Sequence, residues 1–221
     1  MRVVIAGGHG QIALELERLL SARGDNPVGL VRNPAYADDL AAAGAETVVC
    51  DLESASVDEL AGQLKAADAV VFAAGAGPGS GSDRKDTVDR AAAVLLAEAA
   101  ALAGVRRYLL VSSMGVGRPL AAGSDDSWAA YMVAKTAAEE AVREYDNLDW
   151  TVLRPGGLTN GAPTGRVRLE APSTMRGTIT RSDVAAVLVA LLDAPATAGL
   201  TLELIAGDDA ITDAVVAVSG G

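Results

Sequence analysis

The chain has 221 residues and a formal net charge of −11, from 29 acidic and 18 basic side chains. This excess of negative charge argues against a nucleic-acid backbone or an anionic membrane surface as a partner. With one cysteine and one histidine, the sequence allows no intrachain disulfide, no cysteine zinc cluster and no multi-histidine site, so we expect no metal. Apolar residues make up 50% but aromatic residues only 3%, so alanine, valine and leucine must form the core.

The first twenty residues predict a strand, a glycine turn and a helix in immediate succession. The strand is the apolar run 2–6, and apolar residues return at helical spacing from Ile12 onward. Between them, Gly8-x-Gly10-x-x-Ala13 fits a dinucleotide-binding fingerprint, which requires this strand–turn–helix context. Small residues let the chain turn, let a pyrophosphate approach the backbone and let the helix pack on the sheet. The helix N-terminus would then face the phosphates.

The same alternation continues along the chain and predicts the fold. Further strands are expected at 27–31, 47–50, 69–72, 108–111, 150–153 and 200–205, with a possible short strand at 166–169. Helices are expected at 35–43, 57–64, 86–102, 128–145 and 184–192, the last with Ser182 as N-cap. Strands that are continuous apolar runs between helices are typical of a parallel sheet covered on both faces. We therefore predict an α/β protein: one Rossmann-like doubly wound parallel sheet, residues 1–221 forming a single domain.

Two segments break the alternation. Residues 75–82 consist of glycine, alanine, serine and proline, and form either a ligand-binding loop at the carboxyl end of a strand or a plain connector. Residues 158–180 are irregular and predict a small C-terminal appendage on the substrate side of the sheet. No apolar run is long enough to cross a bilayer, and the strand at 2–6 leaves no room for a signal peptide. We therefore expect a cytoplasmic protein with no membrane partner.

Arg32 indicates which nucleotide would bind. It stands about twenty positions beyond the glycine turn, where dinucleotide folds place the residue that meets the adenosine ribose. An acidic residue there holds the 2′-hydroxyl of NAD, whereas a guanidinium offers a fork of donors to a phosphate. We predict a preference for NADP(H), with NAD(H) the weaker ligand; the alternative is an exposed arginine with no ligand.

Tyr131 and Lys135 are four residues apart in a predicted helix and therefore share one face. A lysine charge about 4 Å from a phenol, at an effective dielectric constant near 20, is worth roughly 4 kcal/mol. It could lower the phenol pKa by up to about three units from its usual value near 10, before burial opposes it. Such a tyrosine could exchange a proton with a substrate oxygen that Ser112 or Ser113 also holds. The alternative is a solvated helix face.

Together these segments resemble the short-chain dehydrogenase/reductase superfamily. More narrowly, they resemble its atypical NAD(P)-binding or NmrA-like members, which are related to epimerase/dehydratases and to flavin/biliverdin reductases. The segments that carry the resemblance are Gly7–Ala13, Val31–Pro34, Asp51–Leu52, Val111–Ser113, Tyr131-x-x-x-Lys135, Trp150–Leu158 and Ser182–Ala185. The resemblance covers most of the chain, from residue 2 to about residue 190.

The resemblance implies a role for each matching residue. The pyrophosphate turn would be Gly7, Gly8, His9, Gly10, Gln11 and Ile12. The adenosine end would be held by Arg32 and Asn33 at the 2′-phosphate, Asp51 and Leu52 at the adenine, and Ala73, Ala74 and Gly75 along the ribose. The nicotinamide end would be held by Ser112, Lys135, Pro155, Gly156 and Leu158. Tyr131 would be the catalytic acid/base, with Lys135 and Ser113 assisting.

Some positions depart from this pattern. His9 stands where the family more often has threonine or serine, so it either assists a phosphate or faces solvent. The segment after Gly157 is too short for the substrate lobe of a full epimerase. It carries Arg166, Arg168 and Arg176, with Arg181 just beyond, which either bind an anionic substrate or are solvated.

We therefore predict an NADP(H)-dependent oxidoreductase that acts on a small molecule through Tyr131 and Lys135. One alternative is a non-catalytic redox sensor or regulatory protein that binds NADP(H). Another is a flavin- or tetrapyrrole-type reductase in which Tyr131 is dispensable. The helices at 86–102 and 128–145 could pair with a second copy, so monomer and homodimer both stay open.

Overall fold

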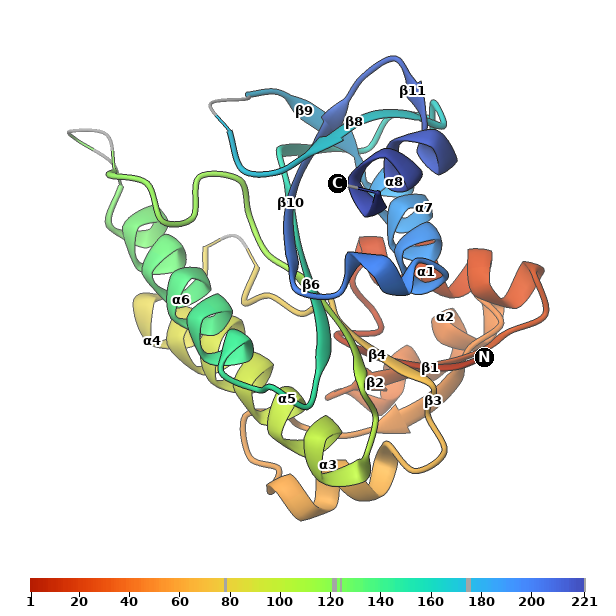
Figure 1. Cartoon of the computed structure of the whole chain (residues 1–221). Helices are drawn as coiled ribbons and strands as arrows, with labels where there is room; N and C mark the ends of the chain where they lie inside the picture. The colour runs from red at the N-terminus through yellow and green to blue at the C-terminus, as the bar shows by residue number, and fades with distance from the viewer. Residues whose placement is uncertain (78, 121–122, 124, 174–175, 221) are drawn as a thin grey trace.

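A computed structural model of the chain describes residues 1–77, 79–120, 123, 125–173 and 176–220. Its main sheet has nine strands in the order β11-β8-β10-β6-β5-β4-β1-β2-β3 (Figure 1). The strands are β1 (Arg2–Ala6), β2 (Asn26–Val31), β3 (Glu46–Val49), β4 (Ala69–Phe72), β5 (Arg107–Val111), β6 (Asp149–Pro155), β8 (Arg166–Glu170), β10 (Leu200–Ala206) and β11 (Asp209–Ala210). β1 to β6 and β10 run parallel, whereas β8 and β11 add an antiparallel edge.

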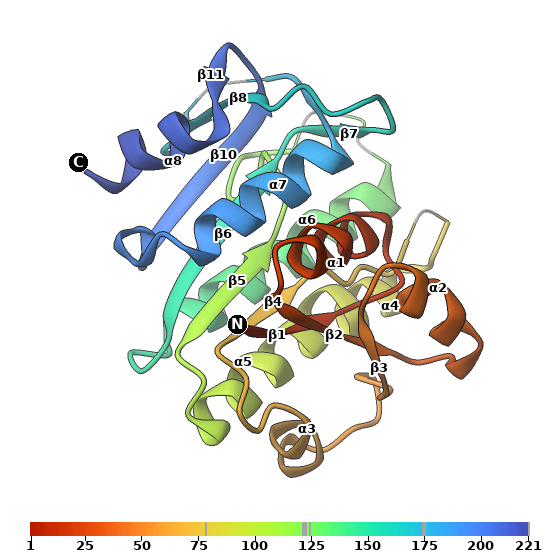
Figure 2. The same ribbon diagram turned by 90° about the vertical axis from the view of Figure 1, so that its right-hand side faces the viewer.

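Helices cover both faces of this sheet (Figure 2). One layer contains α1 (Gln11–Ala22), α7 (Arg181–Leu192) and α8 (Ile211–Ser219), and the other contains α3 (Val57–Gln63), α5 (Ala92–Ala103) and α6 (Asp126–Arg143). The period-two alternation of β1 feeds both layers, because Val3 and Ile5 pack with α1 and α7 while Val4 and Ala6 pack with α5. The predicted α/β class with a doubly wound, mostly parallel sheet is confirmed.

The remaining elements are short. A 3₁₀ turn, η1 (Pro34–Tyr36), leads into α2 (Ala37–Ala42); α4 (Ser82–Arg84) precedes a π-helix, η2 (Lys85–Ala91); and η3 (Pro195–Thr197) follows α7. The segment 158–180 contributes β8 and a small parallel pair, β7 (Gly157–Thr159) and β9 (Thr178–Thr180). Pro78 in the loop 75–82, and residues 174–175 in the segment 158–180, lie outside the described residues.

Three details differ from the predictions. The helix expected at 86–102 is present but begins as the π-helix η2 before α5, and β11 and α8, after residue 205, were not predicted. The N-cap of α7 is Thr180 rather than Ser182, because the side chain of Thr180 accepts the Asp183 amide at 2.9 Å and the helix already begins at Arg181.

The strand order places the candidate site. The parallel strands β1 to β6 all end at one edge of the sheet, and the order reverses between β1 and β4. In open parallel sheets, ligands bind in the crevice outside the carboxyl ends of the strands at such a reversal. None of the described helices is long and apolar enough to span a bilayer.

Candidate functional site

The glycine turn after β1 is built around two close backbone contacts. Gly7 has a φ of +83°, and a Cβ there would lie 2.6 Å from Cα of Ala74 after β4. A Cβ on Gly8 would lie 2.7 Å from Cα of Gly29 in β2. α1 begins directly beyond, and its N-cap Gly10 offers no side-chain hydrogen bond to the first amides. These amides and the positive end of the helix are therefore open to an anion.

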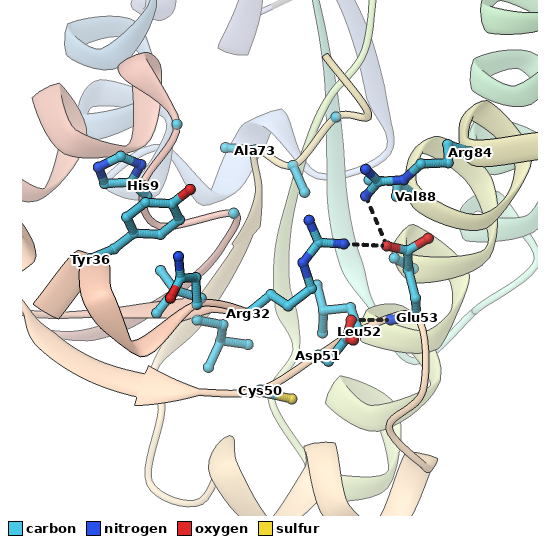
Figure 3. A pocket seen from close by; sticks show the side chains of 18 of the residues that line it. His9, Arg32, Tyr36, Cys50, Asp51, Leu52, Glu53, Ala73, Arg84 and Val88 are labelled. Carbon is cyan, nitrogen blue, oxygen red and sulfur yellow. Dashed lines mark hydrogen bonds and ion pairs between the residues drawn. The ribbon is translucent and has the colours of Figure 1, made fainter. Parts of the chain in front are cut away.

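The first cavity lies at the ends of β1, β2, β3 and β4 and has a volume of about 590 Å³ (Figure 3). Ten of the predicted cofactor-binding residues line it: Gly7, His9, Gly10, Arg32, Asn33, Asp51, Leu52, Ala73, Ala74 and Gly75. Four consecutive strand ends thus bring together residues that are nearly seventy positions apart in the sequence.

Arg32 does not extend freely into solvent. Its Nη1 donates to Oε2 of Glu53 at 2.9 Å, and Nη2 of Arg84 donates to the same oxygen at 2.9 Å (Figure 3). The other carboxylate oxygen of Glu53 accepts the hydroxyl of Thr87 at 2.7 Å. The hydrogen bond from Thr87 and the two guanidinium groups together hold the pKa of Glu53 below its usual range.

His9 lies in the cavity wall in a defined position. Its Nε2 is 2.8 Å from Oδ2 of Asp39, and its ring stacks on Tyr36 with centroids 3.6 Å apart. Asn33 fixes the adjoining turn, because its side chain accepts the Ala35 amide at 3.0 Å. The single histidine is thus held by neighbours from η1 and α2 rather than free in solvent.

A second cavity of about 620 Å³ lies beside the ends of β5 and β6 and the first half of α6. Five predicted site residues line it: Ser113, Tyr131, Pro155, Gly156 and Leu158. Its remaining wall combines apolar groups, including Met114, Leu120, Trp128 and Met132, with Arg118, Arg176 and Arg181. Among its described lining residues there is no acidic side chain.

Only part of the arginine group expected in the segment after Gly157 reaches a cavity. Arg176 and Arg181 line the second cavity. Arg166 donates to the Asp208 carbonyl at 2.5 Å, and Arg168 pairs with Glu170 at 2.9 Å on the antiparallel edge.

Tyr131 shares a hydrogen bond with Ser113, yet its environment opposes ionisation. Burial, and then the negative charge of Asp89, raise the pKa of Tyr131 to about 12, and the Ser113 contact only partly offsets this. The expected lowering of this pKa by Lys135 is therefore wrong. Because Lys135 is paired with Asp89, its charge is compensated, and its Nζ lies 5.9 Å from the Tyr131 ring centroid.

Lys135 is 3% exposed and lies beneath the edge of the sheet. Its Nζ donates to the Val111 carbonyl at 3.1 Å and lies 3.4 Å from Oδ1 of Asp89. Burial lowers the pKa of Lys135, and the carboxylate of Asp89 opposes that effect. Oδ2 of Asp89 accepts the Ala76 amide at 3.2 Å, which ties the lysine to the loop that follows β4.

The structure does not bring every predicted site residue into a cavity. Gly8 packs against Gly29, Ile12 lies in the core, and Gln11 lines a smaller cavity of about 260 Å³ beside α1 and α7. Ser112 directly follows β5 and lines none of these three cavities, whereas Ser113 lines the second. The Ser112 hydroxyl donates to the buried Glu139 at 2.5 Å.

Sequence reasoning missed Glu53, Arg84, Thr87 and Asp89. Glu53 directly follows the Asp51-Leu52 pair, and the other three follow the glycine-rich loop, so their positions after strand ends were an available signal. What the sequence does not show is that these two segments lie on opposite sides of one cavity.

The residues present fit a dinucleotide better than a metal. The uncapped N-terminus of α1, the glycine contacts and the arginines of the first cavity match an adenine nucleotide with several phosphates. No group of three or more histidine, cysteine or carboxylate side chains in the described part of the chain could hold a metal ion.

Comparison with known proteins agrees with this geometry. Residues 7–195 match a family described as NAD(P)H-binding. The chain is 38% identical to the uncharacterized sugar epimerase YhfK of Bacillus subtilis, over 97% of this chain and 99% of that protein. A structure described as an NAD-dependent epimerase/dehydratase from Bacillus halodurans superposes with a TM-score of 0.90 and 35% identity, covering 99% and 100% of the two chains.

A third relative is a reductase by name. The anaerobillin reductase ChuY of Escherichia coli O157:H7 superposes with a TM-score of 0.75 and 27% identity, covering 95% of this chain and 98% of ChuY. The family match covers the glycine turn, both cavities and α7, and the full-length relatives extend it to the rest of the chain. The chain therefore belongs to the NAD(P)H-binding family, within the atypical short-chain dehydrogenase/reductases.

Proposed function

We propose that the protein is an NADP(H)-dependent oxidoreductase that reduces a small organic anion. The observation that carries this proposal is the pair of cavities at one edge of the sheet. The first contains the glycine turn and Arg32, and the second contains Tyr131, with Lys135 buried beneath the edge. NADP(H), when bound, supplies the hydride; the chain supplies binding, orientation and a proton.

Arg32 supports the preference for NADP(H). Its side chain is 56% exposed at the mouth of the first cavity, and only one of its five N–H groups has a described partner. The remaining donors suit a phosphomonoester, which a guanidinium binds with charge-assisted hydrogen bonds.

Tyr131 is suited to donate a proton rather than to remove one. With a pKa of about 12 it is protonated throughout the neutral range, and it lines the second cavity together with its hydrogen-bond partner Ser113. During reduction of a carbonyl, the Tyr131 proton would pass to the substrate oxygen as hydride reaches the carbon. The phenolate left behind would recover its proton from solvent. Ser113 would hold the same oxygen, and Lys135 would keep the loop after β4 in place through Asp89.

The wall of the second cavity supports an anionic, partly apolar substrate. Arg176 and Arg181, with no described acidic residue, face a space that Trp128 and two methionines also line; the third arginine, Arg118, is paired with the buried Glu203. ChuY is named an anaerobillin reductase, and reduction of a tetrapyrrole-type substrate would suit such a wall. A flavin- or tetrapyrrole-type substrate that takes hydride directly is therefore the second candidate, and it would not need Tyr131.

The substitution Tyr131→Phe tests the proposal. General acid–base catalysis contributes roughly 100-fold to 10,000-fold, so we expect at least a 100-fold loss of NADPH oxidation with a competent carbonyl substrate. The affinity for NADPH should change less than about twofold, since Tyr131 lies in the second cavity. Tyr145→Phe, outside both cavities, is the matched control and should keep full activity.

Each other outcome identifies an alternative. Normal turnover by Tyr131→Phe would remove the tyrosine from the mechanism and favour direct hydride transfer to a flavin or tetrapyrrole. If the wild-type protein binds NADPH but oxidises it with no member of a broad carbonyl and flavin panel, the proposed enzyme activity is wrong and a redox sensor is favoured.

A further inference from the structure

Glu53 forms a bridge across the first cavity. It lies in the loop after β3, while Arg32 directly follows β2 and Arg84 ends α4 beyond the glycine-rich loop (Figure 3). One carboxylate oxygen accepts a hydrogen bond from each of the two guanidinium groups at 2.9 Å, and the other accepts a hydrogen bond from the Thr87 hydroxyl. The side chain of Glu53 is only 25% exposed, although it lies at the cavity mouth.

The donors of this arrangement are spaced to suit one compact oxyanion. Because each arginine nitrogen lies 2.9 Å from the same oxygen, the two nitrogens are at most twice that distance apart. A phosphate group is wide enough to accept hydrogen bonds from both. Each guanidinium has five N–H groups, of which the described contacts with Glu53 use one. Two guanidinium groups bind a doubly charged phosphate more strongly than they bind one carboxylate.

We propose that Glu53 occupies the site of the 2′-phosphate of NADP(H), and that Arg84 is a second phosphate-binding residue opposite Arg32. This inference rests on the proposed use of NADP(H) and assigns Glu53 and Arg84 as its specificity determinants. The carboxylate keeps the arginines together in the free protein. It competes with the phosphate and must turn away when NADP(H) binds. NAD(H) has a hydroxyl at this position and gains nothing from the exchange.

Two substitutions separate the roles of the two side chains. Arg84→Gln removes one phosphate donor, and Glu53→Gln removes the competing charge while keeping the side-chain shape. Arg106→Gln and Glu140→Gln are the matched controls. The first removes an exposed arginine paired with Asp149, and the second an exposed glutamate on α6, so each reproduces one change in net charge outside the cavities.

The measurement is the dissociation constant by calorimetry for NADP⁺, NAD⁺, 2′-AMP and 5′-AMP. We expect Arg84→Gln to weaken the binding of NADP⁺ and 2′-AMP about tenfold, which corresponds to the loss of one charge-assisted hydrogen bond of roughly 1.4 kcal/mol. The dissociation constants of NAD⁺ and 5′-AMP should change less than twofold. Glu53→Gln should tighten the binding of NADP⁺ and 2′-AMP by roughly fivefold and leave the affinity for NAD⁺ unchanged. Both control variants should bind all four ligands as the wild-type protein does.

Three results would contradict the inference. Weaker NADP⁺ binding in Glu53→Gln would make Glu53 a positioning residue for the arginines rather than a competitor. Weaker NAD⁺ binding by Glu53→Gln would instead mean that Glu53 accepts a hydrogen bond from the ribose 2′-hydroxyl. An unchanged NADP⁺ affinity in Arg84→Gln would remove Arg84 from the site. Failure of the proposed cofactor use is a separate result, seen as wild-type protein that binds NAD⁺ more tightly than NADP⁺ or binds neither.

Discussion

Glu17 is a buried carboxyl group beside the glycine turn, and its burial costs stability. It is fully buried on α1, and neither carboxylate oxygen has a hydrogen-bond partner among the described residues. A Cβ on Gly29 would lie only 2.7 Å from Oε1 of Glu17, so the glycine leaves room for the carboxyl group. Burial raises the pKa of Glu17 to about 8, so the side chain is mostly neutral at pH 7.

Stability should therefore fall as pH rises through the neutral range. The folded protein keeps the Glu17 proton up to about pH 8, whereas the unfolded chain loses it near 4.5. Between these values the folded state binds more protons, so the free energy of unfolding decreases by up to about 1.4 kcal/mol per pH unit. We expect Glu17→Gln to gain a few kcal/mol over wild type between pH 5 and pH 8 in urea unfolding.

Glu15→Gln is the control for this experiment. Glu15 is on the same helix but pairs with Arg18 at the surface, so its difference from wild type should be the same at both pH values. A Glu17→Gln difference that does not grow with pH would contradict the assignment of a neutral, buried carboxyl group.

At the scale of residues, the sequence predicted positions better than contacts. Arg32 and the glycine turn could be placed because a fixed spacing after β1 carries the information. The pairing of Arg32 with Glu53 and Arg84 could not, because it depends on how two loops approach one another. The pKa of Tyr131 was predicted in the wrong direction for the same reason, since both the burial that raises it and the charge of Asp89, which adds to this, depend on tertiary packing.

At the scale of elements, the strands were predictable because they are continuous apolar runs. The π-helix η2 was not, because alanine and valine continue at near-helical spacing through it. α8 was missed because its sequence is short and close to the end of the chain, although it packs against β8 and buries Ala214 and Val215. Apolar periodicity thus located the main elements but not local changes of helix type.

The π-helix has a testable structural role through Asp89. Asp89 is fully buried and faces Lys135, whose side chain is 4% exposed. Asp89→Asn would leave the lysine charge buried without a counter-charge, and breaking such a pair typically costs about 3–5 kcal/mol. We expect Asp89→Asn to lower the free energy of unfolding, measured in urea, by about 3 kcal/mol. The double variant that combines Asp89→Asn with Lys135→Met should lose less than the sum of the losses of the two single variants.

Asp86→Asn provides the comparison on the same π-helix. Asp86 pairs with Arg90 at 2.5 Å at the surface, where both side chains are more than a third exposed. Its loss should cost less than about 1 kcal/mol. Equal effects at positions 86 and 89, or strict additivity with Lys135→Met, would contradict the buried ion pair.

At the scale of the whole molecule, charge and topology act together. The chain carries a net charge of −11, whereas Arg176 and Arg181 line the second cavity beside Arg118, which pairs with Glu203. In the first cavity Asp51 and Glu53 offset Arg32 and Arg84. A local excess of arginine, as in the second cavity, concentrates anionic ligands against the overall repulsion. The alternation of strands and helices predicted where the cavities lie, because parallel strands end at one edge. The association of copies is not fixed by that pattern, so monomer and homodimer remain predictions.

A crystal structure of the protein with NADP⁺ tests most directly whether the two cavities receive one cofactor. We expect the 2′-phosphate between Arg32 and Arg84, with Glu53 displaced, and the nicotinamide beside Tyr131 and Pro155. A nucleotide bound with its adenosine outside the first cavity, or with its nicotinamide pointing away from Tyr131, would contradict the proposed function.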